Sequence, residues 1–436
     1  MTRTEHAQRS GAPDPVLSNT SDATVADGTV AQEVAEPVLL DMPRDGVPEV
    51  IATLPALKRA ARAIAAGTGP VSVDAERASG FRYGQRAFLV QIRREGSGTW
   101  LIDPVPFENL DEIQEAIGDE IWILHAASQD LPCLAELGMA PSVLFDTELA
   151  ARIAGLPRVG LGPAVESLLG LKLAKEHSAA DWSTRPLPEP WLRYAALDVE
   201  VLDVLRLELI KILEADQKIE IAEQEFEAVR TAPPAPPRVD PWRRTSGLHQ
   251  IRERRTLAAV KNLWEAREAL AKSRDVAPGR LIPDSALIAA AKAMPTSVPA
   301  LLKTKGFHGR SASKDAPRWL KALQDARFAK ELPPNQVPSN APPPPRVWAD
   351  KDPLAAARLQ TARARISRIS ESMNIPLENL LTPDYLRRIC WRPPSEIDPD
   401  SVAQALAELG ARQWQIDALA PVITVALLDP DELEGR

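Results

Sequence analysis

Two acidic side chains end a short apolar run and could together bind a metal ion. The run is VSVDAE, residues 71–76, and its carboxylates are Asp74 and Glu76. Residues two apart in a strand point to the same face, so both carboxylates would alternate with Val73 and Ala75. Like charges on one face repel unless a cation lies between them, and hard divalent ions such as Mg²⁺ or Mn²⁺ prefer oxygen ligands. The alternative is two solvated carboxylates at a frayed strand end.

A third carboxylate, Asp198, lies in EPWLRYAALDVEVLDVL, a segment whose pattern predicts one helix over residues 189–205. At about 100° per residue, Asp198 falls near the centre of the apolar arc, and Tyr194 falls about 40° from it. A buried carboxylate without a partner is costly, so Asp198 requires a basic partner or a metal ion. A buried structural ion pair is the alternative.

Asp130 follows an apolar run, residues 121–127, and lies at the start of a predicted helix. An acidic side chain in a first helical turn also has an ordinary explanation, because it complements the helix dipole. With the three carboxylates above, it makes a set that could hold two divalent ions about 4 Å apart. Such ions can activate a water, stabilise a trigonal-bipyramidal phosphate and hold a leaving 3′-oxygen. A nearby tyrosine hydroxyl such as that of Tyr194 could orient the water.

The elements that must position these residues are short strands and helices. Apolar runs bounded by glycine, proline or charged residues predict strands at residues 71–76, 88–94, 99–105 and 121–127. Helical patterns at residues 54–67 and 130–138 precede and follow them. This mixture predicts an α/β sandwich around a central sheet.

Two proline-rich stretches, APPAPPRVDP and LPPNQVPSNAPPPPR, divide the chain. Neither can join a helix or a central strand, so both are expected to be extended spacers. The third ordered segment loosely repeats the order of helical patterns in the second, which predicts two small all-α domains of one type. The expected organisation is an acidic, disordered tail at 1–37, an α/β domain at 38–230, a linker at 231–241, a helical domain at 242–331, a linker at 332–347 and a diverged helical domain at 348–436.

The charge distribution permits a nucleic-acid partner despite a net charge of −8. Much of the negative charge lies in residues 1–37 and in the last eight residues, whereas residues 240–280 hold ten Lys or Arg against five acids. A local basic surface, rather than the total charge, decides whether nucleic acid binds. The two cysteines, Cys133 and Cys390, are expected to be buried and not disulfide-linked. No stretch predicts a membrane span, and the N-terminus does not look like a signal peptide.

Together these segments resemble the DEDDy group of 3′–5′ exonucleases, and the chain as a whole resembles the ribonuclease D family in its actinobacterial, high-GC Gram-positive form. VSVDAE, LHAASQDLPCL and YAALDVEVL match the three exonuclease motifs. The stretch KEHSAADWSTRPLPEPWLRYAALDV, and DWSTRPL within it above all, is more specific than any single motif. Residues 242–295 resemble the HRDC domain that ribonuclease D shares with RecQ-type helicases. The resemblance is clear from about residue 38 to 330 and weaker from 350 to 436.

The resemblance implies an α/β ribonuclease H-like exonuclease domain followed by two small all-α, HRDC-like domains. It implies a two-metal-ion 3′–5′ exoribonuclease that uses Mg²⁺ or Mn²⁺ and releases nucleoside 5′-monophosphates. On this chain Asp74 would bridge both ions, and Glu76 and Asp198 would complete the site on the nucleophile side. Asp130 would support the other ion through water, and Tyr194 would orient the hydrolytic water.

The implied substrate is RNA with a free 3′ end, tRNA precursors among others, handled by a monomer in the cytoplasm. Two alternatives stay open, because the carboxylates do not test for a 2′-hydroxyl: a DNA exonuclease in repair, and a non-catalytic RNA-binding scaffold. Trp242 and Trp264 could stack on bases but are expected to be core residues. The residues that could contact the substrate are Tyr83, Gln91, His125, Arg243, Arg244, Arg252, Arg254 and Arg255.

Overall fold

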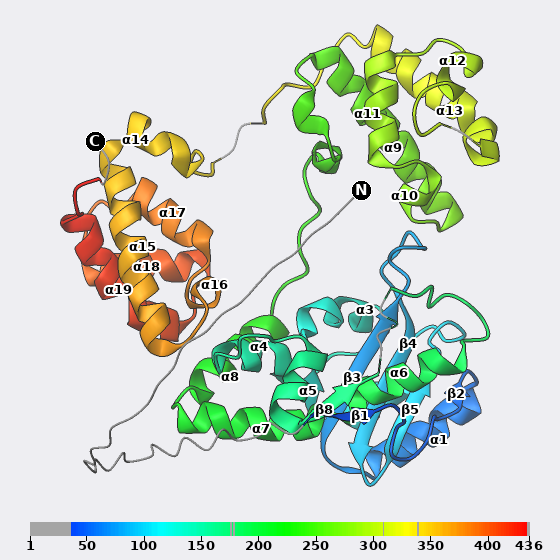
Figure 1. Cartoon of the computed structure of the whole chain (residues 1–436), viewed down its shortest axis with the longest axis vertical. Coiled ribbons are helices and arrows are strands. Elements are labelled where there is room, and N and C mark those ends of the chain that lie inside the picture. The colour runs from blue at the N-terminus through cyan, green and yellow to red at the C-terminus, as the bar shows by residue number, and fades with distance from the viewer. Residues whose placement is uncertain (1–35, 175–176, 178, 308, 338–339, 434–436) are drawn as a thin grey trace, which may run out of the picture. The chain divides into compact units, whose positions relative to one another are not determined.

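The computed structural model describes residues 36–433 except 175–176, 178, 308 and 338–339. The chain from Pro37 onward forms one compact unit. The tail that the sequence predicts to be disordered, residues 1–37, lies almost entirely outside the described residues. Figure 1 shows the ribbon with its elements labelled. Among the described residues, no helix is both long and apolar enough to cross a membrane.

A six-stranded mixed sheet forms the centre of the first domain, in the order β2-β5-β4-β3-β6-β7. Strands β3, β4 and β5 are antiparallel neighbours, whereas β2–β5, β3–β6 and β6–β7 are parallel pairs. The four strands predicted from apolar runs are all present. The bounds are β2 Val50–Ile51, β3 Thr68–Arg77, β4 Ala87–Glu95, β5 Gly98–Ile102, β6 Ile121–Leu124 and β7 Val143–Asp146.

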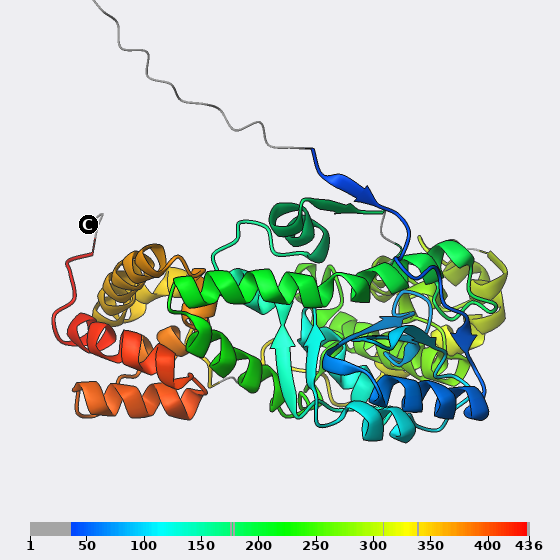
Figure 2. The same cartoon turned by 90° about the horizontal axis from the view of Figure 1, so that it is seen from below.

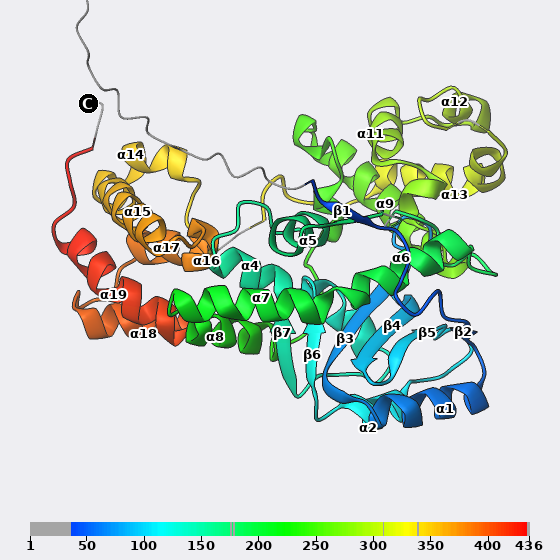
Figure 3. The ribbon, with the colours of Figure 1, turned by 60° about the horizontal axis from the view of Figure 1, so that its bottom comes forward.

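The alternation along β3 decides which face of the sheet carries the acidic residues. Val71, Val73 and Ala75 pack into a core with α1 (Leu54–Ala65) and α2 (Asp111–Ile117). Because side chains alternate along a strand, Asp74 and Glu76 point to the opposite face. Helices α6 (Glu189–Glu200) and α7 (Leu202–Ala215) cover that face, as Figure 3 shows.

The predicted helix over residues 189–205 is wrong in one respect, because it is two helices. Helix α6 ends at Glu200, and α7 begins at Leu202 after a turn residue, Val201. Both helices bury their apolar side chains, so the hydrophobic periodicity continues across the break and hides it in the sequence. The other helices of this domain are α3 Leu131–Ala135, α4 Thr147–Ile153, α5 Leu161–Leu169 and α8 Ile219–Arg230; a separate two-stranded sheet pairs β1 (Val38–Leu40) with β8 (Leu171–Leu173).

The second domain has its own hydrophobic core, built around a helix of 21 residues, α9 (Arg254–Arg274). Trp242 is buried in this core, and Trp264 packs against it, which confirms the expectation that both are core residues. The remaining helices are α10 Pro278–Leu281, α11 Asp284–Ala293, α12 Val298–Leu302 and α13 Gly309–Phe328.

The third domain shares a core with the first. Trp348 and Leu419 belong to the same buried cluster as Leu213 of α7 and Phe226 of α8. A buried carboxylate on α8, Glu225, also accepts hydrogen bonds from the Arg412 guanidinium and the Trp414 indole. Figure 2 shows the end of α8 beside α19. The helices are α14 Trp348–Lys351, α15 Pro353–Met373, α16 Leu377–Leu380, α17 Pro383–Trp391, α18 Pro399–Leu409 and α19 Gln413–Leu428.

Both cysteines are buried as free thiols, as the sequence predicts. Burial raises the pKa of Cys133 and of Cys390 to about 12, so neither thiol ionises near neutral pH. They therefore act as small hydrophobic residues.

Candidate active site

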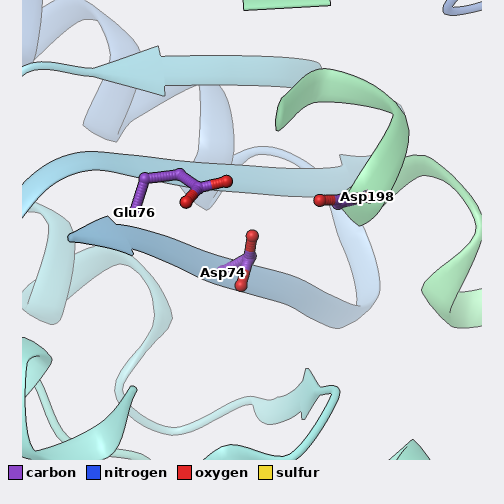
Figure 4. Close-up of side chains that lie close together, drawn as sticks. All are labelled: Asp74, Glu76 and Asp198. Atoms are coloured by element: carbon purple, nitrogen blue, oxygen red, sulfur yellow. The ribbon is translucent and has the colours of Figure 1, made fainter. Parts of the chain in front are cut away.

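Three carboxylates from two elements meet on the face of the sheet beneath α6. Asp74 and Glu76 come from β3 and Asp198 comes from α6, and one oxygen of each lies within 4.8 Å of the others. Figure 4 shows all three side chains pointing toward a common space. The two-residue spacing on β3 places the first two side by side, and the helix that crosses the strand supplies the third.

Asp130 lines the same pocket from the N-terminal end of α3 but lies outside the group of three. Its carboxylate is buried and faces the guanidinium of Arg77, with Oδ1 3.6 Å from Nη2. Arg77 directly follows Glu76 on β3, at an irregularity in the register with β4. Strand β3 therefore contributes two of the acidic side chains and also Arg77, the cation that faces Asp130.

Three of the four carboxyl groups, those of Asp74, Glu76 and Asp130, lie in surroundings that penalise their charge. Burial raises the pKa of Asp74 and Glu76, and for Glu76 the neighbouring Asp74 and Asp198 add to the effect. Burial and then the charge of Asp74 raise the pKa of Asp130 to about 8. A divalent cation would offset this repulsion, and oxygen donors alone suit Mg²⁺ or Mn²⁺. The residues present therefore fit a site for such ions.

Tyr194 lines the pocket one helical turn before Asp198. Burial raises the pKa of its phenol, and the charge of Asp198 and a hydrogen bond to its carboxylate add to that effect. The phenol is therefore neutral near physiological pH and can donate or accept a hydrogen bond. Its ring meets the ring of His177 edge-on at 5.9 Å and lies 6.4 Å from that of Trp182.

Of the three other residues of the first domain that were predicted to contact substrate, only His125 lines the pocket. His125 lines the pocket, its Nδ1 is 2.9 Å from the hydroxyl of Thr147, and burial lowers its pKa to about 4. Gln91 is fully buried on β4 and does not line the pocket. Tyr83 lies in the turn between β3 and β4 and is hydrogen-bonded to Glu268 of α9.

Two acidic residues near the pocket were missed in the sequence. Asp146 ends β7, is buried, and accepts hydrogen bonds from the backbone of Ala126, Ala127, Glu148 and Leu149. It thereby fixes the turn after β6 that carries His125. Glu148 lines the pocket and is held by Arg152 one helical turn later. The run VLFDTEL, a strand followed by an acidic N-cap, was the signal that could have identified Asp146.

Three of the five predicted arginines make contacts within the second domain or with the linkers on either side of it. Arg243 donates to the Asp240 carboxylate and the Pro334 carbonyl. Arg254 donates to the carbonyls of Leu332 and Pro333, and Arg255 donates to carbonyls at the end of α13 and after it. Arg244 and Arg252 are exposed. Arg243, Arg254 and Arg255 thus help to hold the domain and its linkers together, although Arg254 is exposed to solvent like Arg244 and Arg252.

The turn between β3 and β4, residues 78–86, makes a contact with the second domain that we call the hairpin contact. The Ala277 backbone N–H donates to the Phe81 carbonyl at 2.9 Å. Arg280 donates to the Gly80 carbonyl at 2.8 Å, and its guanidinium lies 3.8 Å from the centre of the Phe81 ring. Asp275 accepts from the backbone N–H of Tyr83. The first residue of the contact, Gly80, lies three residues after Arg77, so the contact joins the helical domain to the turn that follows the strand with the acidic residues.

We expect Asp130→Asn to stabilise the metal-free protein, and increasingly so as pH rises. The folded-state pKa of Asp130 lies above its unfolded value of about 3.9. The contribution of Asp130 to the free energy of unfolding is therefore fully present below about pH 4, and it is lost as the pH rises toward 8. In EDTA, the melting temperature of the variant should equal the wild-type value near pH 4 and exceed it by at least about 2–4 °C at pH 8.5. A constant difference across this range would contradict the raised pKa.

The comparisons with known proteins agree with this geometry. Family profiles described as a 3′-5′ exonuclease, an HRDC domain and a 3′ to 5′ exonuclease C-terminal domain match residues 48–214, 256–323 and 341–427. Ribonuclease D of Shewanella sp. (strain ANA-3) is 32% identical over 307 residues, which cover 68% of this chain and 75% of the relative. The chain belongs to the ribonuclease D family. Ribonuclease D of Gluconacetobacter diazotrophicus is 31% identical, over 63% of this chain and 71% of the relative.

Solved structures support the fold along nearly the whole chain. A protein from Bifidobacterium adolescentis is 39% identical, with a TM-score of 0.82, over 90% of this chain and 100% of that one. Escherichia coli RNase D, described as an exoribonuclease involved in structured RNA processing, is 25% identical with a TM-score of 0.63, over 88% of this chain and 99% of that one.

These likenesses confirm the predicted ribonuclease H-like exonuclease domain followed by HRDC and further helical structure. As a member of the ribonuclease D family, the protein is a metal-dependent 3′–5′ exoribonuclease. The third domain of the chain, which is helical, matches the exonuclease C-terminal profile. Its description as a second HRDC-like domain, and the domain boundaries, therefore stay predictions.

Proposed function

We propose that Asp74, Glu76, Asp198 and Asp130 hold two divalent ions, Mg²⁺ or Mn²⁺, at which the 3′-terminal phosphodiester of an RNA is hydrolysed. The observation that carries the proposal is the meeting of three carboxylates within 4.8 Å in a pocket that Asp130 also lines. When bound, such ions activate the attacking water and neutralise charge on the phosphate and the leaving 3′-oxygen. Nucleoside 5′-monophosphates are the expected products.

The role that we propose for Tyr194 is to orient the attacking water. Its phenol is held one turn from Asp198 and stays neutral, so it orients by hydrogen bonding and does not act as a base. His125, also neutral, lines the same pocket and is proposed to contact the terminal nucleotide. Gln91 is fully buried, which disfavours a direct nucleotide contact.

We propose structured RNA with a free 3′ end, tRNA precursors included, as the substrate. The description of the Escherichia coli relative as an enzyme of structured RNA processing supports this choice. The exposed Arg244 and Arg252 are proposed to bind phosphates, with smaller contributions from Arg243, Arg254 and Arg255, whose guanidiniums are already engaged. We propose that Tyr83, whose backbone N–H donates to Asp275, acts through the hairpin contact. We further propose that the protein acts as a monomer in the cytoplasm.

A digest of end-labelled substrates tests the proposal. Matched RNA and DNA oligonucleotides, each labelled at the 5′ end, would be incubated with Mg²⁺, with Mn²⁺ or with EDTA. We expect stepwise shortening of RNA from its 3′ end with either ion and no cleavage in EDTA. Faster cleavage of the DNA would favour the repair alternative, and binding without hydrolysis under every condition would favour the scaffold alternative.

The hairpin contact is expected to matter for structured RNA more than for short oligomers. Arg280→Ala removes a hydrogen bond to Gly80 and a cation–π contact with Phe81, together about 1 kcal/mol at an exposed position. We therefore expect the KM for a structured RNA to rise about fivefold, with the KM of a short oligomer unchanged. Lys321→Ala is the matched control, since it removes an exposed charge on α13 that the contact does not use. If Lys321→Ala raised the KM for structured RNA as much as Arg280→Ala does, the effect would come from the lost positive charge and not from the hairpin contact.

A further inference from the structure

Gln91 lies beside Asp74 on the neighbouring strand. The two residues are Cα partners in the antiparallel pair of β3 and β4, and on its other side Gln91 is the partner of Leu101 in β5. Directly paired residues share a face, with Cβ atoms about 4.5–5.5 Å apart. The Gln91 side chain therefore lies on the face that carries the carboxylates.

The surroundings of Gln91 on that face are apolar. Leu89 and Leu101, its neighbours along β4 and on β5, belong to one buried cluster with Ala195 and Ala196 of α6. Helix α6 packs across β3, β4 and β5, and Gln91 has no exposed surface. A leucine or methionine would pack equally well against these apolar neighbours, so packing alone does not explain why residue 91 is a glutamine.

The amide of Gln91 is unsatisfied in the part of the chain that the structure describes. Neither its Nε2 nor its Oε1 has a hydrogen-bond partner. Burying an unpaired amide costs about 1–3 kcal/mol relative to a paired one, and such groups in native proteins generally serve a purpose. Among the unpartnered buried side chains described, Gln91 is the one paired across a strand with a proposed metal ligand.

We propose that Gln91 is a positioning residue: its amide N–H, which has no partner among the described residues, would donate to the neighbouring Asp74 carboxylate when a metal ion binds and orient that ligand. The proposal rests on the assignment of Asp74 as a ligand. A carboxylate has about four acceptor positions, and carboxylates that bind metals are generally hydrogen-bonded by a further side chain. A neutral amide suits this role because it orients Asp74 without competing with a cation for the negative charge, as lysine or arginine would.

Calorimetric titration of Mn²⁺ into the EDTA-stripped full-length protein, without RNA, tests the proposal. Gln91→Met keeps the volume and removes the amide, so we expect Mn²⁺ affinity to fall about 10–100-fold. The melting temperature in EDTA should stay at or above the wild-type value, because no unpaired amide is buried any longer. Loss of affinity together with retained stability separates a positioning role from a packing role. A Mn²⁺ affinity within twofold of wild type would overturn the proposal.

Two further variants make the outcome specific. Leu89→Met is the matched control, because Leu89 lies on the same face opposite Glu76 and has no polar group; its Mn²⁺ affinity should equal that of the wild type, and a loss equal to that of Gln91→Met would overturn the proposal. Asp74→Asn should weaken Mn²⁺ binding at least as much as Gln91→Met. Wild-type affinity in Asp74→Asn would instead show that the assignment of Asp74 as a ligand has failed.

Discussion

Asp74→Asn should lower RNA hydrolysis by about 10³-fold or more while leaving RNA binding intact. The substitution keeps the shape of the side chain and replaces one of the three clustered carboxylates by a neutral amide. Ions at such sites contribute several kcal/mol of transition-state stabilisation, and each 1.4 kcal/mol is a factor of about ten in rate. The rate would be measured as stepwise shortening of a 5′-labelled RNA at saturating Mg²⁺.

Binding would be compared in EDTA, where neither protein is expected to cleave. Removing a negative charge near the phosphates should leave the affinity of Asp74→Asn equal to or slightly above that of the wild type. Asp203→Asn is a suitable control, because Asp203 is half-exposed on α7 and forms an ordinary surface pair with Arg206. Retention of hydrolysis by Asp74→Asn would refute the two-metal assignment.

Tyr194→Phe should lower kcat by about 10²-fold with little change in KM. Phenylalanine preserves the ring contacts with His177 and Trp182, so the variant removes only the hydroxyl. Groups that position or transfer a proton in the transition state contribute about 10²–10⁴-fold, and an orienting hydroxyl belongs at the lower end. Steady-state kinetics on a short RNA oligomer would give both parameters.

Two observations would separate this role from simple packing. Unchanged turnover in Tyr194→Phe would show that the residue only packs against its neighbours. Because the pKa of the phenol is raised, the wild-type pH–rate profile should also contain no step from Tyr194 between about pH 6 and 9. If the wild-type pH–rate profile did contain such a step and Tyr194→Phe lacked it, the tyrosine would instead act as a general acid or base.

The core that the third domain shares with the first limits what removal of the third domain could show about RNA binding. Its Trp348 and Leu419 share a core with α7 and α8, and Glu225 would be left buried without the groups of Arg412 and Trp414 that pair with it. Removing residues 332–436 would thus expose apolar surface and damage the exonuclease domain itself. The contribution of the helical domains to RNA binding is better measured with single substitutions such as Arg280→Ala.

The acidic residues could be found from the sequence because burial makes polar residues conspicuous in a periodic apolar pattern. Period two placed Asp74 and Glu76 on one face of a strand, and period 3.6 placed Asp198 on a buried face of a helix. Both placements depend only on local geometry, and the structure agrees with them. The resemblance then connected three motifs that are far apart along the chain.

Other features depended on contacts that local periodicity does not encode. The break at Val201 is invisible in the sequence because both helices bury apolar side chains. The pairing of Arg77 with Asp130 requires the end of β3 to lie beside the start of α3.

By itself, then, the sequence determined the chemistry available to this protein: three carboxylates and a tyrosine on elements whose periods turn them inward, and a fourth carboxylate, Asp130, at the start of a helix. The tertiary structure alone decided how those groups are held. It set Gln91 opposite Asp74 through the strand register and joined the third domain to the first through a common core. The physical reason is that side-chain direction follows from the local backbone repeat, whereas register and domain packing follow from long-range contacts.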